Sequence, residues 1–243
     1  MKKRADLLLV ERGLFPSRAR ARAAIMAGGV RVGGVAIAKP SDLAPEGAAI
    51  EAVAAHPWVS RGGVKLAAAL DAFDLDPSGL ACLDVGASTG GFTEVLLSRG
   101  AAHVSAIDVG HGQIDAKLRR DARVTALEGL DARKLLASHL PRPPQALVCD
   151  VSFISQRLVW PHVLPLAAPG AWLVTLIKPQ FEAGRENLVK GAVKDPIVLA
   201  EACDGVRRCV EALGWSSLGL MASPITGGDG ALEFLYAARH GRP

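Results

Sequence analysis

The chain has 243 residues, and half of them are apolar, so it can bury the core of one large domain or of a medium domain beside a small one. The formal net charge of +4 is unevenly placed: residues 1–60 hold nine Lys and Arg against five Asp and Glu, and residues 61–243 hold nineteen of each. A basic first quarter joined to a neutral body indicates a segment that binds a polyanion, although a solvated basic face is the alternative.

The composition does not indicate secretion, a membrane span or a metal site. Leu7–Val10 is too short for a signal-peptide core, and the uncharged stretch Leu158–Ile177 is divided by three prolines and a glycine into helix, turn and strand. The cysteines form no C-x-x-C pair, which favours buried thiols in a reducing compartment and excludes a zinc site. They are Cys82, Cys149, Cys203 and Cys209. We therefore expect a soluble, cytoplasmic protein.

Residues 1–52 predict two helices followed by short strands. The first helix covers Asp6–Glu11, and the second begins after the N-cap Ser17 and ends before Gly28. Val30–Val32 and Val35–Ile37 flank two glycines, which is typical of a hairpin. Residues 53–61 are predicted to be a linker, and the domain boundary is placed between residues 58 and 59.

From residue 62 onward strands and helices alternate, which predicts an α/β fold with a doubly wound, Rossmann-like parallel sheet. The predicted strands are Ala81–Val85, His103–Asp108, Arg123–Glu128, Ala146–Asp150, Trp172–Ile177, Leu218–Ser223 and Ala231–Ala237. The predicted helices are Gly91–Ser98, Gln113–Leu118, Ala132–Ser138, Ile154–Leu166 and Ile197–Leu213. The last two strands are joined by a short connection and should form an antiparallel hairpin, as in the methyltransferase variant of the Rossmann plan.

A glycine-rich loop follows the first strand of the large domain and opens a helix. Its spacing is G-x-x-x-G-G rather than the G-x-G-x-x-G that places a pyrophosphate on a helix N-terminus. S-adenosylmethionine has no phosphate, and a carboxylate directly before the loop suits its ammonium group. The loop residues predicted to bind this cofactor are Asp84, Gly86, Ser88, Gly90, Gly91 and Phe92.

Two further aspartates follow strands on the same side of the sheet. Asp108 lies about 20 residues beyond the loop, the separation at which an acidic residue meets a ribose diol. Asp131 follows the third strand and is expected to line the adenine pocket. For both residues, and most strongly for Asp131, an ordinary helix cap is the alternative reading.

Four charged residues occupy positions where apolar residues are expected or where strands end. Lys65 lies in a predicted apolar helix face, Asp150 and Lys178 end two strands, and Glu233 interrupts the last strand. Because ligands bind outside the carboxyl ends of the strands in such sheets, we expect all four to meet at the cofactor cleft. A surface salt-bridge network is the alternative.

A ribose hydroxyl that attacks a sulfonium methyl needs a near-in-line approach and a proton acceptor. Lys178 is predicted to orient this hydroxyl and to help take up its proton. Burial and Lys65 would favour its neutral amine, whereas Asp150 and Glu233 would favour its ammonium form. The sequence leaves open which effect is larger.

Taken together, these segments resemble the hemolysin A (TlyA) family, in which an S4-type RNA-binding domain precedes an FtsJ-like methyltransferase domain. The resemblance covers nearly the whole chain. It rests on Leu8–Arg18, Trp58–Lys65, Asp84–Thr93, Asp108–Gln113, Asp150–Ser155, Ile177–Glu182 and Ser223–Ile225. Two positions depart from the family pattern: Gly33-Gly34 replaces Asn-Gly in the hairpin, and Gly230-Ala231 replaces Gly-Asn near the end.

The resemblance implies 2′-O-methylation of ribose in ribosomal RNA, typically at cytidine, with RNA or ribosomal subunits as partners. It also implies a Lys-Asp-Lys-Glu catalytic tetrad, which falls on the four charged residues Lys65, Asp150, Lys178 and Glu233. It gives the domains as S4-like over residues 1–58 and FtsJ-like over residues 59–243. A membrane-lytic protein and a non-catalytic RNA-binding module are the alternative functions.

Basic and aromatic residues in the first quarter are predicted to hold the RNA, mainly through phosphates. Those predicted are Arg4, Arg18, Arg20, Arg22, Arg31, Lys39, Trp58 and Arg61. A solubilising face is the alternative for the cations. Trp58 would either stack on a base or pack between the domains.

Overall fold

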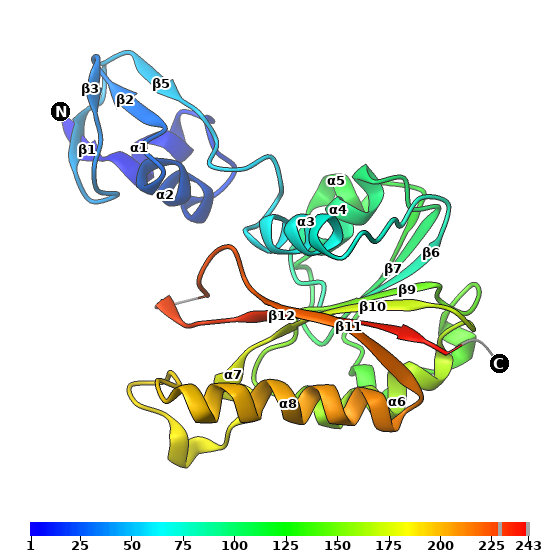
Figure 1. Ribbon diagram of the computed structural model, residues 1–243. Coiled ribbons are helices and arrows are strands. Elements are labelled where there is room, and N and C mark those ends of the chain that lie inside the picture. Colours follow the sequence, from blue (N-terminus) through cyan, green and yellow to red (C-terminus); the bar gives the residue numbers. More distant parts are fainter. Residues whose placement is uncertain (228–229, 242–243) are drawn as a thin grey trace. The chain divides into compact units, whose positions relative to one another are not determined.

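The computed structural model describes residues 1–227 and 230–241. The chain divides into two compact units, Met1–Pro57 and Trp58–Pro243, and each is considered by itself (Figure 1). The division lies one residue before the expected boundary.

The first unit packs two helices against small sheets. Helices α1 (Ala5–Glu11) and α2 (Arg18–Met26) were both predicted, and Ser17 caps α2 by accepting a hydrogen bond from the Arg20 N–H. The three-stranded sheet places β2 (Val30–Val32) between β3 (Val35–Ala36) and β5 (Ile50–Ala52). A second pair joins β1 (Lys2–Arg4) to β4 (Leu43–Pro45). The sequence did not predict β1, β4 and β5, because three residues carry too little periodicity to identify a strand.

The second unit contains a seven-stranded sheet in the order β11-β12-β10-β9-β6-β7-β8. Its first five strands in sequence are parallel, and β12 lies antiparallel between β10 and β11. The strands are β6 (Ala81–Val85), β7 (His103–Asp108), β8 (Val124–Glu128), β9 (Ala146–Cys149), β10 (Trp172–Ile177), β11 (Trp215–Ala222) and β12 (Phe234–His240). The predicted fold, a doubly wound sheet ending in an antiparallel hairpin, is confirmed.

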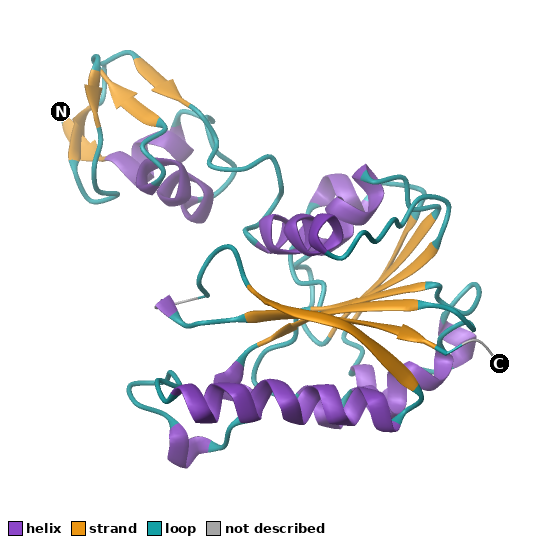
Figure 2. Ribbon diagram, viewed as in Figure 1, coloured by secondary structure: helices purple, strands orange, loops and turns teal. Residues whose placement is uncertain are grey.

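Helices cover both faces of this sheet (Figures 1 and 2). One face packs against α3 (Gly62–Ala72), α4 (Gly91–Ser98) and α5 (Ala116–Arg119), and the other against α6 (Trp160–Val163) and α8 (Pro196–Ala212). Strands β6, β9 and β10 are buried along their whole length. Such burial on both faces is why they read as unbroken apolar runs.

The structure corrects two of the predicted helices. The prediction of a helix over Ala132–Ser138 was wrong, since the segment forms two separate 3-10 turns. Ile154–Leu166 is likewise no continuous helix: 3-10 turns lie on either side of the single turn α6. Pro161 and Pro165 each remove a backbone donor there, which prevents a longer helix.

The last strand also begins later than predicted. It starts at Phe234, so Glu233 precedes the strand instead of interrupting it. The Glu233 carbonyl still accepts a hydrogen bond from Ser223 N–H, which continues the pairing beyond β11. The intervening connection includes residues 228–229, which lie outside the described part of the chain.

Candidate active site

The glycine loop after β6 brings its backbone against the end of β9. Gly86 has φ +81°, and a Cβ there would lie 2.7 Å from the Asp150 carbonyl oxygen. Gly90 has φ +93°, and a Cβ there would meet the Leu118 side chain. Both positions therefore require glycine for conformation and for space.

Two adjoining pockets open at the carboxyl ends of the parallel strands. The larger has a volume of about 500 Å³ and the smaller about 200 Å³. They share four residues, which are Gly86, Ser88, Asp150 and Ser152. Together they fall within the size range of small-molecule sites.

The larger pocket combines an apolar wall with a fixed carboxylate. Ile107, Val109, Leu130 and Ile154 contribute apolar surface. Asp108 accepts hydrogen bonds from the backbone N–H groups of Ser88 and Gly110, each at 2.7 Å. A carboxylate has about four acceptor positions, so Asp108 retains the capacity to accept two more hydrogen bonds from a ligand.

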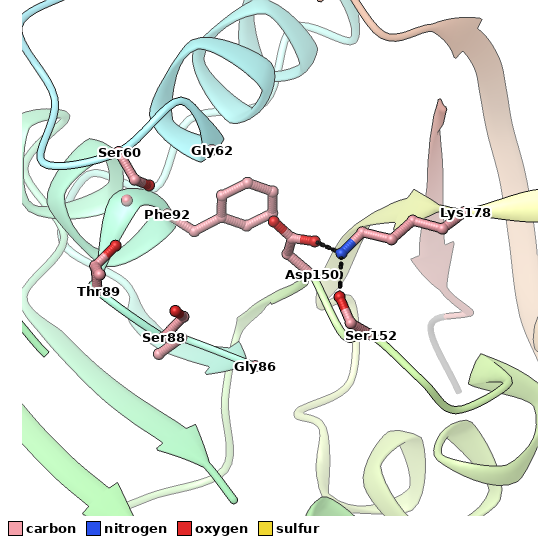
Figure 3. Close-up of a pocket in the computed structure, with 11 residues that line it drawn as sticks. Ser60, Gly62, Gly86, Ser88, Thr89, Phe92, Asp150, Ser152 and Lys178 are labelled. Atoms are coloured by element: carbon pink, nitrogen blue, oxygen red, sulfur yellow. Dashed lines mark hydrogen bonds and ion pairs between the residues drawn. The ribbon is translucent and has the colours of Figure 1, made fainter. Parts of the chain in front are cut away.

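The smaller pocket lies between the glycine loop and Lys178 (Figure 3). The Lys178 Nζ atom is 2.6 Å from Asp150 Oδ1 and donates a 2.7 Å hydrogen bond to Ser152 Oγ. Phe92 forms part of the wall, and the linker residue Ser60 and the helix start Gly62 complete it. An ammonium group held by two neighbours therefore faces the pocket in a defined orientation.

Lys65 and Glu233 form a second ion pair, buried within the unit. Their Nζ and Oε2 atoms are 2.5 Å apart, and both side chains are less than a tenth exposed. Lys65 lies on α3, which contacts β10 and β12. Neither residue lines the two pockets.

The sheet register places the two ion pairs beside each other. In the antiparallel pair of β10 and β12, Ile177 lies opposite Phe234. Continuing this register by one residue sets Lys178, which follows β10, opposite Glu233, which precedes β12. Lys178 and Glu233, one from each pair, thus lie across from each other at one end of two neighbouring strands. The sequence did not specify how the four residues pair.

Asp84 has a different environment from the one expected for it. Its side chain is fully buried, lines neither pocket, and accepts a 2.6 Å hydrogen bond from Thr93 Oγ1. Its Oδ1 atom has no hydrogen-bond partner among the described residues. Burial, to which the charges of Asp150 and Asp108 add, raises the pKa of this carboxyl to about 7. Any effect of Asp84 on a ligand is therefore indirect.

Asp131 acts as a cap, which was the alternative to a cofactor contact, and it also lines the larger pocket. Its carboxylate caps the turn Ala132–Lys134 by accepting from the Arg133 N–H at 2.9 Å. The Arg133 guanidinium lowers the pKa of Asp131 to about 2. Of the remaining loop residues, Gly91 and Phe92 line the smaller pocket, and Gly90 supports it from behind.

The cations predicted to bind RNA in the first unit have three kinds of environment. Arg4 and Arg18 both donate to the buried carboxylate of Asp6 at 3.0–3.1 Å, and the hydrogen bond from Arg4 is the main cause that lowers the pKa of Asp6 to about 2. Arg20 and Arg31 donate to backbone carbonyls of His56 and Gly34. Arg22 and Lys39 are exposed, and no ion pair of either side chain occurs within residues 1–57.

The two predicted RNA contacts in the second unit also differ. Trp58 is half-buried and packs on Gly63, where a Cβ would lie 2.3 Å from the indole ring. It contacts the core beneath α3 and α4. Arg61 is exposed directly before α3. The indole of Trp58 therefore has a packing role within its own unit.

Sequence reasoning missed three residues at the pocket mouth. Ser152 is the second partner of Lys178, and Ser60 lines the smaller pocket. Phe153 is 90% exposed, has φ +64° and lines the larger pocket. An exposed ring on a left-handed backbone is an unusual conformation for a bulky residue. The position of Ser152 and Phe153 directly after Asp150 was the available signal.

Comparison with known proteins matches each unit to a family. Residues 58–240 match the FtsJ-like methyltransferase family, and residues 3–50 match the S4 domain. Within the described part of the chain, no helix has the length and apolarity to cross a membrane.

Relatives resemble the chain over nearly its whole length. It is 44% identical to the 16S/23S rRNA (cytidine-2'-O)-methyltransferase TlyA of Mycobacterium tuberculosis, over 97% of this chain and 89% of that protein. It is 37% identical to Hemolysin A of Brachyspira hyodysenteriae, over 96% of this chain and 98% of that protein. A solved Streptococcus thermophilus structure described as a hemolysin has a TM-score of 0.79 and 38% identity, and covers 100% of this chain and 90% of that one.

Proposed function

The chain belongs to the FtsJ-like methyltransferase family and carries an S4 domain, and we propose that it transfers a methyl group from S-adenosylmethionine to the ribose 2′-hydroxyl of a cytidine in ribosomal RNA. The observation that carries this proposal is the ammonium group of Lys178, which lines the smaller pocket and is held by Asp150 and Ser152, two residues that line both pockets. The activity named for the 44% identical relative supports the choice of substrate.

The residues of the larger pocket fit the proposed cofactor. Gly86 lines both pockets, and a Cβ there would lie 2.7 Å from the carbonyl oxygen of Asp150, which lines both as well. Asp108 retains acceptor positions suited to a ribose diol. The apolar wall, with Leu130 and Ile154, suits an adenine ring. When bound, S-adenosylmethionine supplies a methyl group on a positively charged sulfur. Gly86, Ser88, Asp108 and Asp131 would hold its nucleoside, and Gly91 and Phe92 would border its amino-acid tail.

The proposed role of Lys178 is to orient the acceptor hydroxyl. An ammonium has three N–H donors; one is donated to Ser152, and Asp150 is held as an ion pair, so at least one donor remains for the ribose oxygen. A hydroxyl held at a fixed distance and angle reacts faster because its orientation entropy has already been lost. An ammonium has no acceptor position, so the carboxylate of Asp150, paired with Lys178, is the group proposed to accept the proton that the hydroxyl loses as the oxygen takes the methyl group from sulfur.

The Lys65–Glu233 pair is proposed to stabilise the position and the positive charge of Lys178. Both charges are buried and satisfied by one another, and the register sets Glu233 opposite Lys178. A carboxylate at that position stabilises the positive charge of the lysine that faces the acceptor. Removing either partner would leave an unpaired buried charge, which costs several kcal/mol.

The first experiment is substitution of Lys178 by alanine. We expect Lys178→Ala to abolish methyl transfer to ribosomal RNA, measured with tritiated methyl groups, because the acceptor hydroxyl is no longer oriented. Cofactor affinity, measured by calorimetry, should change less than about threefold, since Lys178 is none of the residues proposed to hold the nucleoside or to border the amino-acid tail. Equal loss of transfer and of cofactor binding would contradict the assigned role.

Mass-spectrometric mapping of RNA incubated with the pure protein tests the reaction itself. We expect one methyl group on the ribose of a cytidine, in small- or large-subunit RNA. Methylation on a base would contradict the ribose hydroxyl as acceptor. No methylation of naked RNA or of either purified subunit would favour the non-catalytic RNA-binding alternative.

A further inference from the structure

A second connection lies behind the Asp150–Lys178 pair, between the same two segments of chain. Asp150 follows β9 and Lys178 follows β10, and these strands are parallel neighbours. Lys178 leads directly into the single helical turn α7 (Pro179–Glu182). Asp150 leads through a loop into the 3-10 turn Gln156–Leu158. Glu182 joins these turns, and no role proposed above uses it.

Glu182 is a buried carboxylate whose contacts come from three consecutive residues. Ser155 Oγ donates to Oε2 at 2.5 Å, and the Gln156 backbone N–H donates to Oε1 at 2.7 Å. Arg157 places its Nε atom 3.4 Å from Oε2 and donates from Nη2 to the Glu182 carbonyl at 2.8 Å. Only 5% of Glu182 is exposed. The loop after Asp150 is therefore tied to the turn after Lys178.

The side chain of Gln156 extends this connection into the sheet. Its Nε2 group donates to the Leu176 carbonyl at 2.7 Å, and its Oε1 atom accepts from Thr175 Oγ1 at 2.7 Å. Both partners belong to β10, two and three residues before Lys178. Gln156 is itself 2% exposed. The loop from β9 is thus bound to the strand that carries Lys178 and to the turn that follows it.

Such a network is an expensive way to stabilise a fold. Burial raises the pKa of Glu182, although its hydrogen bonds and Arg157 lower it. The free energy that the ionised side chain loses with its hydration is therefore larger than the free energy that its partners contribute. Replacing buried ionic groups by apolar ones of similar volume is often neutral or stabilising. A fully satisfied polar network does, however, fix a single arrangement of the groups that it joins.

We propose that Glu182 is a positioning residue that holds the loop after β9 against the turn after β10 and thereby sets the distance and direction between Asp150 and Lys178. The inference rests on the proposed function, because it assumes that this pair serves the acceptor hydroxyl. Glu182 itself lines neither pocket, so it acts only through the residues that it holds. Displacement of a reacting group by about 1 Å can cost about 100-fold in rate.

The experiment compares Glu182→Ala and Glu182→Gln with the wild-type protein in steady-state methyl transfer. We expect kcat to fall about 100-fold for Glu182→Ala and about tenfold for Glu182→Gln, which keeps one acceptor oxygen. The KM for RNA and the calorimetric Kd for S-adenosylmethionine should change less than about threefold. Glu186→Gln, an exposed carboxylate on the turn after α7, is the matched control and should leave all three values unchanged.

A crystal structure of Glu182→Gln gives a readout independent of activity. We expect the separation of Lys178 Nζ and Asp150 Oδ1 to increase from 2.6 Å. If Glu182→Ala does not fold, Ser155→Ala removes a single donor of the network and should lower kcat in the same direction. A merely structural role would lower the urea midpoint of these variants while kcat and the ion-pair distance stay at wild-type values, and that result would overturn the proposal.

Lys178→Ala, assayed in parallel, separates this proposal from the proposed function. If Lys178→Ala is inactive and folded Glu182 variants keep the wild-type kcat, only the positioning role is wrong. If Lys178→Ala keeps the wild-type kcat, the proposed function of the ion pair is wrong, whatever the Glu182 variants do.

Discussion

At the scale of single residues, burial makes the carboxyl of Asp84 harder to ionise than it would be in water. The carboxyl is fully buried and is hydrogen-bonded by Thr93, and its pKa is raised to about 7. In the unfolded chain the same group has a pKa near its ordinary value of about 3.9. The protonated carboxyl therefore favours folding below about pH 4, and this contribution is lost as pH rises toward 7.

Substitution of this residue tests the pKa through stability. We expect the free energy of unfolding of Asp84→Asn, relative to the wild type, to increase between about pH 4 and about pH 8, because the amide never ionises. Urea titrations at several pH values measure this difference. A difference that stays constant across that range would show that the buried carboxyl has an ordinary pKa.

Sequence reasoning identified the charged residues of the site but not how they pair. Lys65, Asp150, Lys178 and Glu233 stand out because each interrupts or ends an apolar segment. Their partners depend on sheet register and on the packing of α3, neither of which is encoded locally. The same limit explains why Glu182 was overlooked, since its partners lie 25–27 residues away.

At the scale of elements, the boundaries of β6, β7, β10 and α4 were predicted to the residue. These elements are buried apolar runs, or a helix that starts at a glycine loop, and both have sharp ends in the sequence. Predictions failed where prolines broke a helical pattern, at α6, and where a strand start depended on pairing, at β12. Tertiary contacts decide such boundaries.

A glycine of the loop after β6 and a glycine before β6 offer a matched pair of substitutions. Gly86 and Gly79 both have positive φ, but a Cβ at Gly79 would meet nothing within 4 Å. We expect Gly79→Ala to destabilise the second unit by about 1–2 kcal/mol from the left-handed backbone alone, and Gly86→Ala to destabilise it by more, because its Cβ also meets the Asp150 carbonyl. Only Gly86→Ala should also weaken S-adenosylmethionine binding, by at least about tenfold, because its methyl group clashes with the Asp150 carbonyl.

Calorimetric titration with the cofactor, together with urea unfolding, measures both effects. Equal cofactor affinity of the two variants would contradict the placement of the cofactor against Gly86.

At the scale of the whole molecule, the charge excess lies in the first unit. Part of that charge is engaged internally, because Asp6 holds Arg4 and Arg18. Such pairs leave other guanidinium N–H groups directed outward, with their orientation fixed. Arg22 and Lys39, without ion pairs in residues 1–57, are free to approach phosphates.

Salt dependence measures this contribution directly. We expect the double variant Arg22→Ala/Lys39→Ala to lower the slope of log K for ribosomal RNA against log salt concentration by about 1–2, with a smaller loss of affinity at high salt. Arg99→Ala, which removes a cation paired with Asp71 in the second unit, is the control and should leave the slope unchanged. An unaltered slope in the double variant would show that other cations contact the RNA.

Lys65 and Glu233 stand 168 positions apart in the chain, one in the first helix of the second unit and the other just before its last strand. Six of the seven strands of the sheet, β6 to β11, lie between these two positions in the sequence. The ion pair can therefore form only after almost the whole sheet has been assembled, and a chain that lacks position 233 keeps a buried ammonium with no counter-charge.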